Sequence, residues 1–268
     1  MEPADGQTTY GLQIQPRMGF FTDTSICIGC KACEVACKEW NLVPEDGLTF
    51  TGNSYDNTGE LGANTWRHVA FVEQQTHDGL RWLMSSDVCK HCTHAGCLDV
   101  CPTGAIVRTE FGTVVIQDDV CNGCGYCVTA CPFGVISKRE LDGDGGMHKC
   151  TLCYDRLEDG LEPACAKACP TKSIQFGPLD ELLERAGGRV SRLQEVGFDD
   201  ARLYGADEND GVGGAGAFFL LLDRPEVYGL PPDPVVPTKH LGESWTAAFV
   251  AGAALVAGAA AAFLGGDE

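Results

Sequence analysis

The chain has 268 residues, 44 % of them hydrophobic, which is enough for one large domain or two small ones with a hydrophobic core. Its 38 acidic and 19 basic residues give a formal net charge of −19. That charge argues against binding to a nucleic-acid backbone and predicts a solvated, acidic surface.

Residues 1–17, MEPADGQTTYGLQIQPR, are polar and contain no apolar run. A cleavable secretory signal requires such a run, so we expect none here, and no twin-arginine pair is present. We expect a flexible N-terminal arm over residues 1–17. On this interpretation the protein either stays in the cytoplasm or crosses a membrane bound to a partner that carries the signal.

The segment after the arm predicts a strand over residues 18–24, MGFFTDT, and a short helix over residues 34–40. Between and within them lie cysteines with the spacing C-x2-C-x2-C-x3-C, namely Cys27, Cys30, Cys33 and Cys37. Residues 41–64 are rich in Gly, Asn, Asp and Thr, which predicts an inserted surface loop. Two strands, over residues 66–74 and 80–85, are expected before the next cysteines.

This cysteine pattern recurs three more times, with one spacer lengthened in the second copy and one gap of eleven residues in the fourth. The further quartets are Cys89, Cys92, Cys97 and Cys101; Cys121, Cys124, Cys127 and Cys131; and Cys150, Cys153, Cys165 and Cys169. Together the four quartets account for all 16 cysteines. Between the second and third quartets, residues 105–117 are rich in β-branched residues around Phe111-Gly112, which predicts a β-hairpin.

The spacing is that of bacterial iron-sulfur ferredoxins, in which three close cysteines hold one cluster and the fourth ligates the other cluster of a pair. Pro102, Pro132 and Pro170 each follow such a fourth cysteine and turn the chain away, whereas Lys38 follows Cys37. Structural zinc is an alternative, but it usually takes two separated C-x2-C pairs, which only the fourth quartet resembles. A secreted disulfide scaffold would be small and rich in cysteine throughout. We therefore expect iron-sulfur clusters.

Ferredoxin-type domains place a hairpin between their two cluster loops, so we expect the second and third quartets to pair, and hence the first and fourth. The expected fold is α+β, with two nested ferredoxin-like units: an inner one over 87–138 and an outer one over 18–45 plus 147–178, separated by an inserted loop and strands over 46–86. By the exchange rule, the expected ligand sets are Cys27, Cys30, Cys33 and Cys169; Cys37, Cys150, Cys153 and Cys165; Cys89, Cys92, Cys97 and Cys131; and Cys101, Cys121, Cys124 and Cys127.

The C-terminal extension, residues 179–244, begins with apolar residues at helical spacing, interrupted by Gly187-Gly188. A glycine-rich loop over 205–216 and an apolar strand over 217–222 follow. The glycines lack the Lys-Ser/Thr ending of a P-loop and the spacing of a dinucleotide fingerprint, which argues against a phosphate site. Residues 230–237, LPPDPVVP, predict an extended proline linker.

Residues 245–264 run for twenty residues without a charge, about the length of helix that crosses a bilayer. Small residues four apart, at Ala254, Gly258 and Ala262, would let a partner helix approach closely. We expect a single transmembrane helix packed on a partner, the alternative being a soluble docking helix. Its flanks carry too few basic residues to orient it, so the side of the membrane stays open.

With these motifs in view, the chain resembles the iron-sulfur (beta) electron-transfer subunit of formate dehydrogenase, one of the four-cluster subunits of molybdenum or tungsten oxidoreductase complexes. The resemblance covers residues 18–264 and lies in the order of the quartets and in the stretches 19–41, 55–66, 87–106, 148–156 and 211–222. The quartets alone also fit the related subunits of nitrate, dimethyl sulfoxide, polysulfide and tetrathionate reductases. The chain departs from the family in its alanine-rich tail and its acidity.

The resemblance implies four [4Fe-4S] clusters, because every quartet is complete. It also implies a molybdopterin-containing catalytic subunit as one partner and a membrane cytochrome b or quinone-reducing subunit as the other, with the chain held at the membrane by its C-terminal helix. We expect no catalytic residues in the chain itself. His91, His94 and His148 lie beside quartets and are expected to tune the clusters rather than ligate them, and Lys90, Lys149 and Arg156 either offset cluster charge or lie at the surface.

Overall fold

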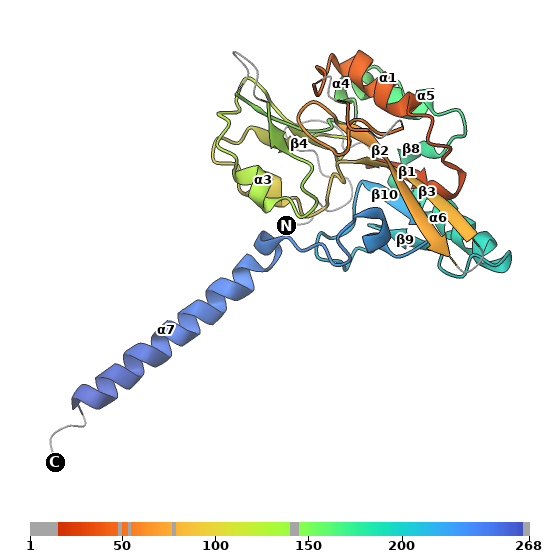
Figure 1. Cartoon of the computed structure of the whole chain (residues 1–268). Helices are drawn as coiled ribbons and strands as arrows, with labels where there is room; N and C mark the ends of the chain where they lie inside the picture. Colours follow the sequence, from red (N-terminus) through yellow and green to blue (C-terminus); the bar gives the residue numbers. More distant parts are fainter. Residues whose placement is uncertain (1–15, 48–49, 53–54, 77–78, 140–144, 265–268) are drawn as a thin grey trace. The chain divides into compact units, whose positions relative to one another are not determined.

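The computed structural model describes residues 16–47, 50–52, 55–76, 79–139 and 145–264, so all but the last two residues of the expected N-terminal arm lie outside it (Figure 1). The chain divides into two compact units, with the boundary between Val236 and Pro237. The first unit contains all sixteen cysteines, every one a free thiol.

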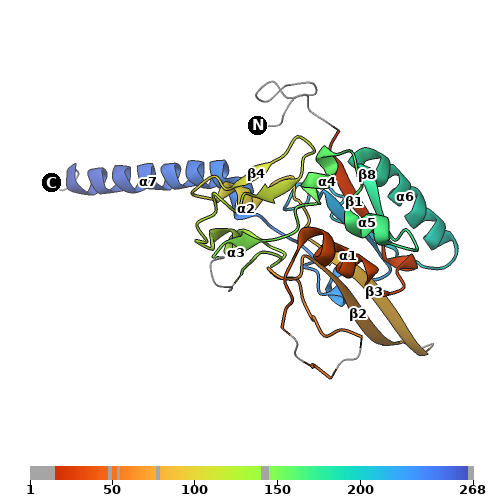
Figure 2. The same ribbon diagram turned by 90° about the horizontal axis from the view of Figure 1, so that it is seen from above.

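A four-stranded sheet organises the first unit, in the order β8-β1-β10-β9 (Figure 1), and Figure 2 shows its strands β1 and β8 side by side. Its strands are β1 (Met18–Asp23), β8 (Ile174–Pro178), β9 (Arg202–Tyr204) and β10 (Ala217–Leu221). The central pair, β1 and β10, is parallel, and the two outer pairings are antiparallel. The strands predicted over 18–24 and 217–222 are confirmed, each one residue shorter at its end.

Both central strands are buried on both faces, which is why they read as unbroken apolar runs. Phe21 and Phe218 lie on one face with their rings stacked at 5.3 Å, in a core shared with the helix α6 (Leu179–Glu195). Phe20 and Phe219 lie on the other face, in the core that includes the cysteines. Side chains alternate along a strand, so this one sheet separates a purely apolar layer from the cysteine-bearing layer.

The helix α6 confirms the predicted helix, and Gly187-Gly188 do not interrupt it. Its buried residues are Leu179, Leu182, Ala186 and Leu193, at spacings that place them on one stripe. Because that stripe is anchored on the sheet at both ends, packing outweighs the weak helix propensity of two glycines.

Short helices follow the cysteine loops: α1 (Ala32–Asn41), α2 (Gly96–Asp99), α3 (Tyr126–Ala130), α4 (Tyr154–Glu158) and α5 (Ala164–Ala168). The helix α1, with the first quartet, contacts α5 from the fourth, while α2 from the second contacts α3 from the third. The predicted hairpin over 105–117 is confirmed as β4 (Ile106–Arg108) paired with β5 (Val114–Ile116). A further two-residue pair, β6 (Ser137–Lys138) with β7 (Met147–His148), precedes the fourth quartet.

A long hairpin, β2 (Arg67–Thr76) with β3 (Gly79–Val88), separates the first two quartets. The predicted strands over 66–74 and 80–85 are therefore confirmed; β2 begins one residue later than predicted, and both strands end further along the chain. In the inserted segment before it, Asp56 accepts hydrogen bonds from Lys31 and His68 at 3.0 Å, which ties this segment to the first cysteine loop.

Residues 230–236 have no regular secondary structure, but they are not a free spacer. Leu230 and Val236 are buried, and the Val236 N–H donates to the Gly211 carbonyl at 3.1 Å. The proline-rich segment after the 3-10 helix η2 (Pro225–Tyr228) therefore packs as part of the first unit.

The second unit consists of the 3-10 helix η3 (Pro237–His240) and the helix α7 (Leu241–Leu264). The helix predicted over 245–264 is confirmed and begins four residues earlier. The segment Thr238–Phe263 contains an 18-residue window with a mean hydropathy of 1.9, none of it buried, so it is long and apolar enough to cross a membrane.

Replacing Gly188 by Ala should raise the free energy of unfolding by about 0.5–1 kcal/mol, because alanine is the better helix former. An added Cβ meets nothing within 4 Å at Gly188. The matched control is Gly19→Ala, whose Cβ would lie 2.3 Å from the Gly216 carbonyl oxygen and which should cost about 1–3 kcal/mol. Anaerobic denaturant unfolding measures both, and a destabilised Gly188→Ala variant would contradict the packing described for α6.

Asp223 makes stability depend on pH. Burial raises its pKa, but hydrogen bonds from Gln74, at 3.1 Å, and the Arg224 N–H, with the charge of Arg81, outweigh burial and lower it. The carboxylate therefore contributes stability that is complete above its unfolded pKa of about 3.9 and is lost as the pH falls through the lower folded value. Unfolding free energy should fall more steeply below about pH 4 in the wild type than in Asp223→Asn; identical slopes would refute this.

Candidate metal centres

Two cysteine groups surround open spaces in the structure. Cys27, Cys30 and Cys33 line one of about 290 Å³ together with Cys169 from the fourth quartet. The second, of about 340 Å³, is lined by Cys89, Cys92, Cys97 and, from the third quartet, Cys131. In both cases three cysteines that are close in sequence lie around the same space as a fourth that is distant in sequence and is followed by proline.

In the other two expected sets the thiols lie close enough to influence ionisation within the set, as some thiols of neighbouring sets also do. The thiols that raise the pKa of Cys37, after burial, belong to Cys150, Cys165 and Cys153. Those that raise the pKa of Cys127, again after burial, belong to Cys121, Cys124 and Cys101. The structure thus brings together all four expected sets, although their ligation of a cluster stays a prediction.

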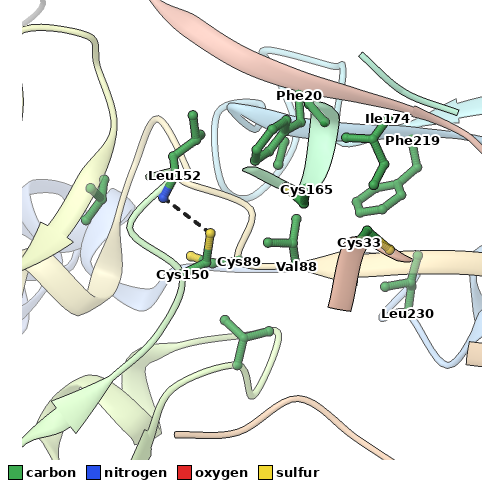
Figure 3. Close-up of a cluster of buried hydrophobic side chains, with 14 of the residues drawn as sticks. Phe20, Cys33, Val88, Cys89, Cys150, Leu152, Cys165, Ile174, Phe219 and Leu230 are labelled. Atoms are coloured by element: carbon green, nitrogen blue, oxygen red, sulfur yellow. Dashed lines mark hydrogen bonds between the residues drawn. The ribbon is translucent and has the colours of Figure 1, made fainter. Parts of the chain in front are cut away.

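The loops repeat one backbone conformation. The residue before the second cysteine of each quartet has positive φ: 65° at Gly29, 45° at His91, 69° at Gly123 and 60° at Leu152. This conformation aims backbone N–H groups at sulfur, as when the Leu152 N–H donates to Cys150 Sγ at 3.3 Å (Figure 3). At Gly29, the first of these four positions, glycine is required because a Cβ would lie 2.6 Å from the Phe71 ring.

A second repeated turn follows the last cysteine of three quartets. Gly104, Gly134 and Lys172 have positive φ and donate to the carbonyls of Cys101, Cys131 and Cys169 at 3.3 Å. Burial raises the pKa of Cys101, but the Thr103 hydroxyl and the backbone N–H groups that this turn directs at the sulfur outweigh burial and lower the pKa.

The first quartet lacks this turn, because the helix α1 continues past Cys37, where Lys38 replaces proline. Asn41 takes over: its Nδ2 donates to the Cys37 carbonyl at 2.8 Å and lies 3.7 Å from Cys37 Sγ and 3.9 Å from Cys153 Sγ. The Asn41 side chain therefore links the first quartet to the fourth. Sequence reasoning missed it, because Asn41 and Cys153 lie 112 residues apart in the chain.

The thiols suit a cationic metal group. Burial, followed by repulsion from neighbouring cysteines, raises the pKa of most of them, to about 11 at Cys127 and about 12 at Cys97 despite Lys149 nearby. Four thiolates gathered in a buried site repel one another, and metal ions that deprotonate and bridge them remove that penalty. Thiolate quartets also match the ligands of [4Fe-4S] clusters, so the residues fit the cofactor that their spacing predicts.

Three basic side chains near the quartets are buried, which excludes a plain surface role. They are Lys90, 1 % exposed, Lys149, 2 % exposed, and Arg156, 5 % exposed. Lys90 Nζ lies 5.1 Å from the Phe219 ring centroid and donates to the Val88 carbonyl at 2.9 Å. Arg156 stacks 4.1 Å from the Trp40 ring. Lys90 also forms an ion pair with Asp87, and buried cations of this kind suit a site that binds anionic clusters.

The three histidines differ in their surroundings. His91 lines the second cysteine space, and its Nδ1 accepts the Val114 N–H at 3.1 Å, so the proton of the neutral ring lies on Nε2. Burial, reinforced by Lys149, holds the pKa of His91 well below its usual value. The ring of His148 stacks on Trp66 at 6.5 Å, whereas that of His94 lies against the backbone of Gly213.

The glycine-rich loop over 205–216 has a role that its sequence concealed. Its backbone pairs with the second cysteine loop: the His94 N–H donates to Val212 at 2.8 Å, and the Thr93 N–H to Gly214 at 3.0 Å. A Cβ on Gly213 would lie 2.3 Å from the His94 ring. The glycines therefore allow two backbones to approach, as expected of glycine at close contacts.

Comparison with known proteins agrees with this chemistry. A 4Fe-4S dicluster domain profile matches residues 80–179, and another matches 26–105. The nitrate-inducible formate dehydrogenase iron-sulfur subunit of Escherichia coli is 44 % identical over 221 residues, 81 % of this chain and 73 % of the relative. The formate dehydrogenase iron-sulfur subunit of Haemophilus influenzae is 44 % identical over 218 residues, 80 % of this chain and 68 % of the relative. The B subunit of the anaerobic dimethyl sulfoxide reductase of Escherichia coli is 40 % identical over 170 residues, 63 % of this chain and 77 % of the relative.

The identities to the formate dehydrogenase subunits extend over most of both proteins, and they accompany two dicluster profiles and sixteen free thiols in four groups. The chain is accordingly a non-catalytic electron-transfer subunit with four [4Fe-4S] clusters, and it belongs to the family of iron-sulfur subunits that includes those of formate dehydrogenases.

Proposed function

We propose that this chain is the electron conduit of a formate-oxidising complex. It would take electrons from a molybdenum or tungsten catalytic subunit and deliver them to a membrane cytochrome b, a quinone-reducing subunit or another acceptor. The support is the identity to two formate dehydrogenase iron-sulfur subunits over about four fifths of the chain. Each bound [4Fe-4S] cluster supplies a one-electron carrier.

Each ligand set combines three cysteines of one quartet with the last cysteine of another. The groups that the fold brings together support this assignment, as does Asn41 between Cys37 and Cys153. The corresponding arrangement is two nested ferredoxin-like units. Its support is that β1 pairs with β8 and α1 contacts α5 across the outer segments, while β4 pairs with β5 and α2 contacts α3 within the inner one.

The single observation that carries a conduction role is that neighbouring ligand sets influence each other in a fixed order. Beyond the effect of burial, a thiol of one set raises the pKa of a thiol in the adjacent set: Cys165 acts on Cys33, Cys89 on Cys150 and Cys127 on Cys97. Figure 3 places Cys89 beside Cys150. This order runs from the set with the exposed Cys30 to the set with the exposed Cys124. A path with a solvent-accessible end at each terminus suits entry and exit of electrons.

The helix α7 supports attachment to a membrane. Its exposed apolar side chains include Phe249, Val250, Leu255, Val256 and Phe263, and the described unit to which it belongs contains nothing that covers them. Insertion into a bilayer, against a partner helix at the small residues, would remove this surface from water.

The rival is the equivalent subunit of another molybdopterin oxidoreductase. Its support is the 40 % identity to the B subunit of a dimethyl sulfoxide reductase. That match covers 63 % of this chain, whereas the match to the formate dehydrogenase subunit of Escherichia coli covers 81 %. In that case electrons would flow through this chain towards the catalytic subunit instead of away from it.

Cysteine-to-serine variants test the proposed ligand sets, and they do so without knowing in advance which spectral signal belongs to which cluster. Cys33→Ser and Cys37→Ser change cysteines four residues apart on the helix α1. We expect Cys37→Ser to alter the same electron paramagnetic resonance signal as Cys150→Ser, and Cys33→Ser the same signal as Cys169→Ser, because these cysteines share clusters. Iron should remain near twelve to sixteen atoms per chain, on about four irons per cluster. If Cys37→Ser reproduced the spectrum of Cys33→Ser, the exchange would be refuted.

Formate tests the partner. In the complex purified anaerobically with whatever subunits accompany this chain, formate should bleach the absorbance of the clusters, because oxidation of formate releases two electrons. Acetate is the matched carboxylate control and should leave the absorbance unchanged. Full bleaching by dithionite, no response to formate and reoxidation by dimethyl sulfoxide would favour the rival.

A further inference from the structure

Arg67 is a buried cation to which the cysteine spacing gives no clue. It begins the strand β2, opposite Val88 of β3, and its side chain is only 2 % exposed. Its guanidinium lies 4.8 Å from the centroid of the Phe20 ring. It is therefore sealed between the long hairpin and the cysteine-bearing face of the central sheet.

Only part of the guanidinium is hydrogen-bonded. Nη1 donates to the carbonyl and to the hydroxyl of Ser86, each at 3.1 Å. Among the described residues, Nε and Nη2 have no hydrogen-bond partner although both are buried. An unpaired buried charge is costly, and a guanidinium always carries its charge, so these donors need an anionic acceptor.

The groups around Arg67 identify that acceptor. Against the effect of burial, the four groups that most favour its charged form are the thiols of Cys165, Cys33, Cys150 and Cys37. Ser86 extends the contact, because its hydroxyl lies 3.2 Å from Cys33 Sγ. In the proposed assignment Cys33 belongs to the first ligand set and the other three to the second. One fixed positive charge thus lies between two sets.

We propose that Arg67 is a positioning residue that sets the reduction potentials of the two outer clusters, with its free N–H groups directed at their sulfur atoms. A cluster with four thiolates is anionic and gains a further negative charge on reduction. A nearby cation therefore stabilises the reduced form more than the oxidised form and raises the potential. Because one guanidinium lies beside thiols of both sets, it raises the two potentials together. This inference rests on the proposed ligand sets.

The first test is a redox titration, followed by electron paramagnetic resonance, of the intact complex with Arg67→Met and Arg67→Lys. Arg67→Met should lower two of the four potentials by at least about 59 mV, a tenfold loss in the equilibrium constant for one-electron reduction. Arg67→Lys keeps the charge and should move the same two by less. Unchanged potentials in a fully loaded Arg67→Met variant, or equal shifts in both variants, would overturn the proposal.

Lys90→Met is the matched control. Lys90 is 1 % exposed and is among the groups that act on Cys92 and Cys131, which belong to the third ligand set. The Lys90→Met variant should lower the potential of a cluster whose potential is unchanged in Arg67→Met. A shift of all four potentials by either variant would mean a general loss of structure and would refute the local effect. If the Cys37→Ser result refuted the ligand sets, two potentials would still respond to Arg67 but would belong to differently grouped cysteines.

A second test needs no variant. In wild-type protein grown with ¹⁵N-arginine and reduced with dithionite, pulsed electron paramagnetic resonance should detect a ¹⁵N nucleus coupled to a reduced cluster, through N–H groups directed at sulfur. The absence of any arginine coupling would overturn the proposal even if Arg67→Met failed to assemble.

Discussion

Mutual repulsion among buried thiolates is the constraint on which the rest of this structure depends. Burial raises the pKa of ten of the sixteen thiols, and neighbouring cysteines add to the rise at most of these. Without metal, such groups favour protonated thiols; with iron, the same closeness becomes four ligands for one cluster. The fold therefore stabilises an arrangement that only a cationic inorganic group completes.

The scaffold holds these groups in place with backbone geometry more than with side chains. The repeated positive-φ positions shape the loops, and the turns after Cys101, Cys131 and Cys169 supply N–H donors to the cysteines. The glycine-rich loop supports the second cysteine loop from outside the quartets. Rigid, preorganised loops suit electron transfer, because a cluster that keeps its surroundings on reduction needs little reorganisation.

Charge is distributed unevenly between the surface and the interior. The chain carries a net charge of −19, yet Arg67, Lys90, Lys149 and Arg156 are all at most 5 % exposed and lie beside cysteines. An acidic exterior keeps the protein soluble and bears on its encounters with partners. The buried cations act at short range in a low dielectric, where each has a larger effect on a cluster than several surface carboxylates.

The sequence by itself determined the cofactor, the family and the principal elements, because these depend on local spacing: the quartets, the apolar runs of β1 and β10, the hairpin of β4 and β5, and the helix α6. It did not determine what covers the cysteines. The role of the glycine loop, the burial of Val236, the link through Asn41 and the position of Arg67 all depend on contacts between residues far apart in the chain. Only tertiary structure brings such residues together, since a buried charge or a close backbone contact leaves no periodic mark on the sequence around it.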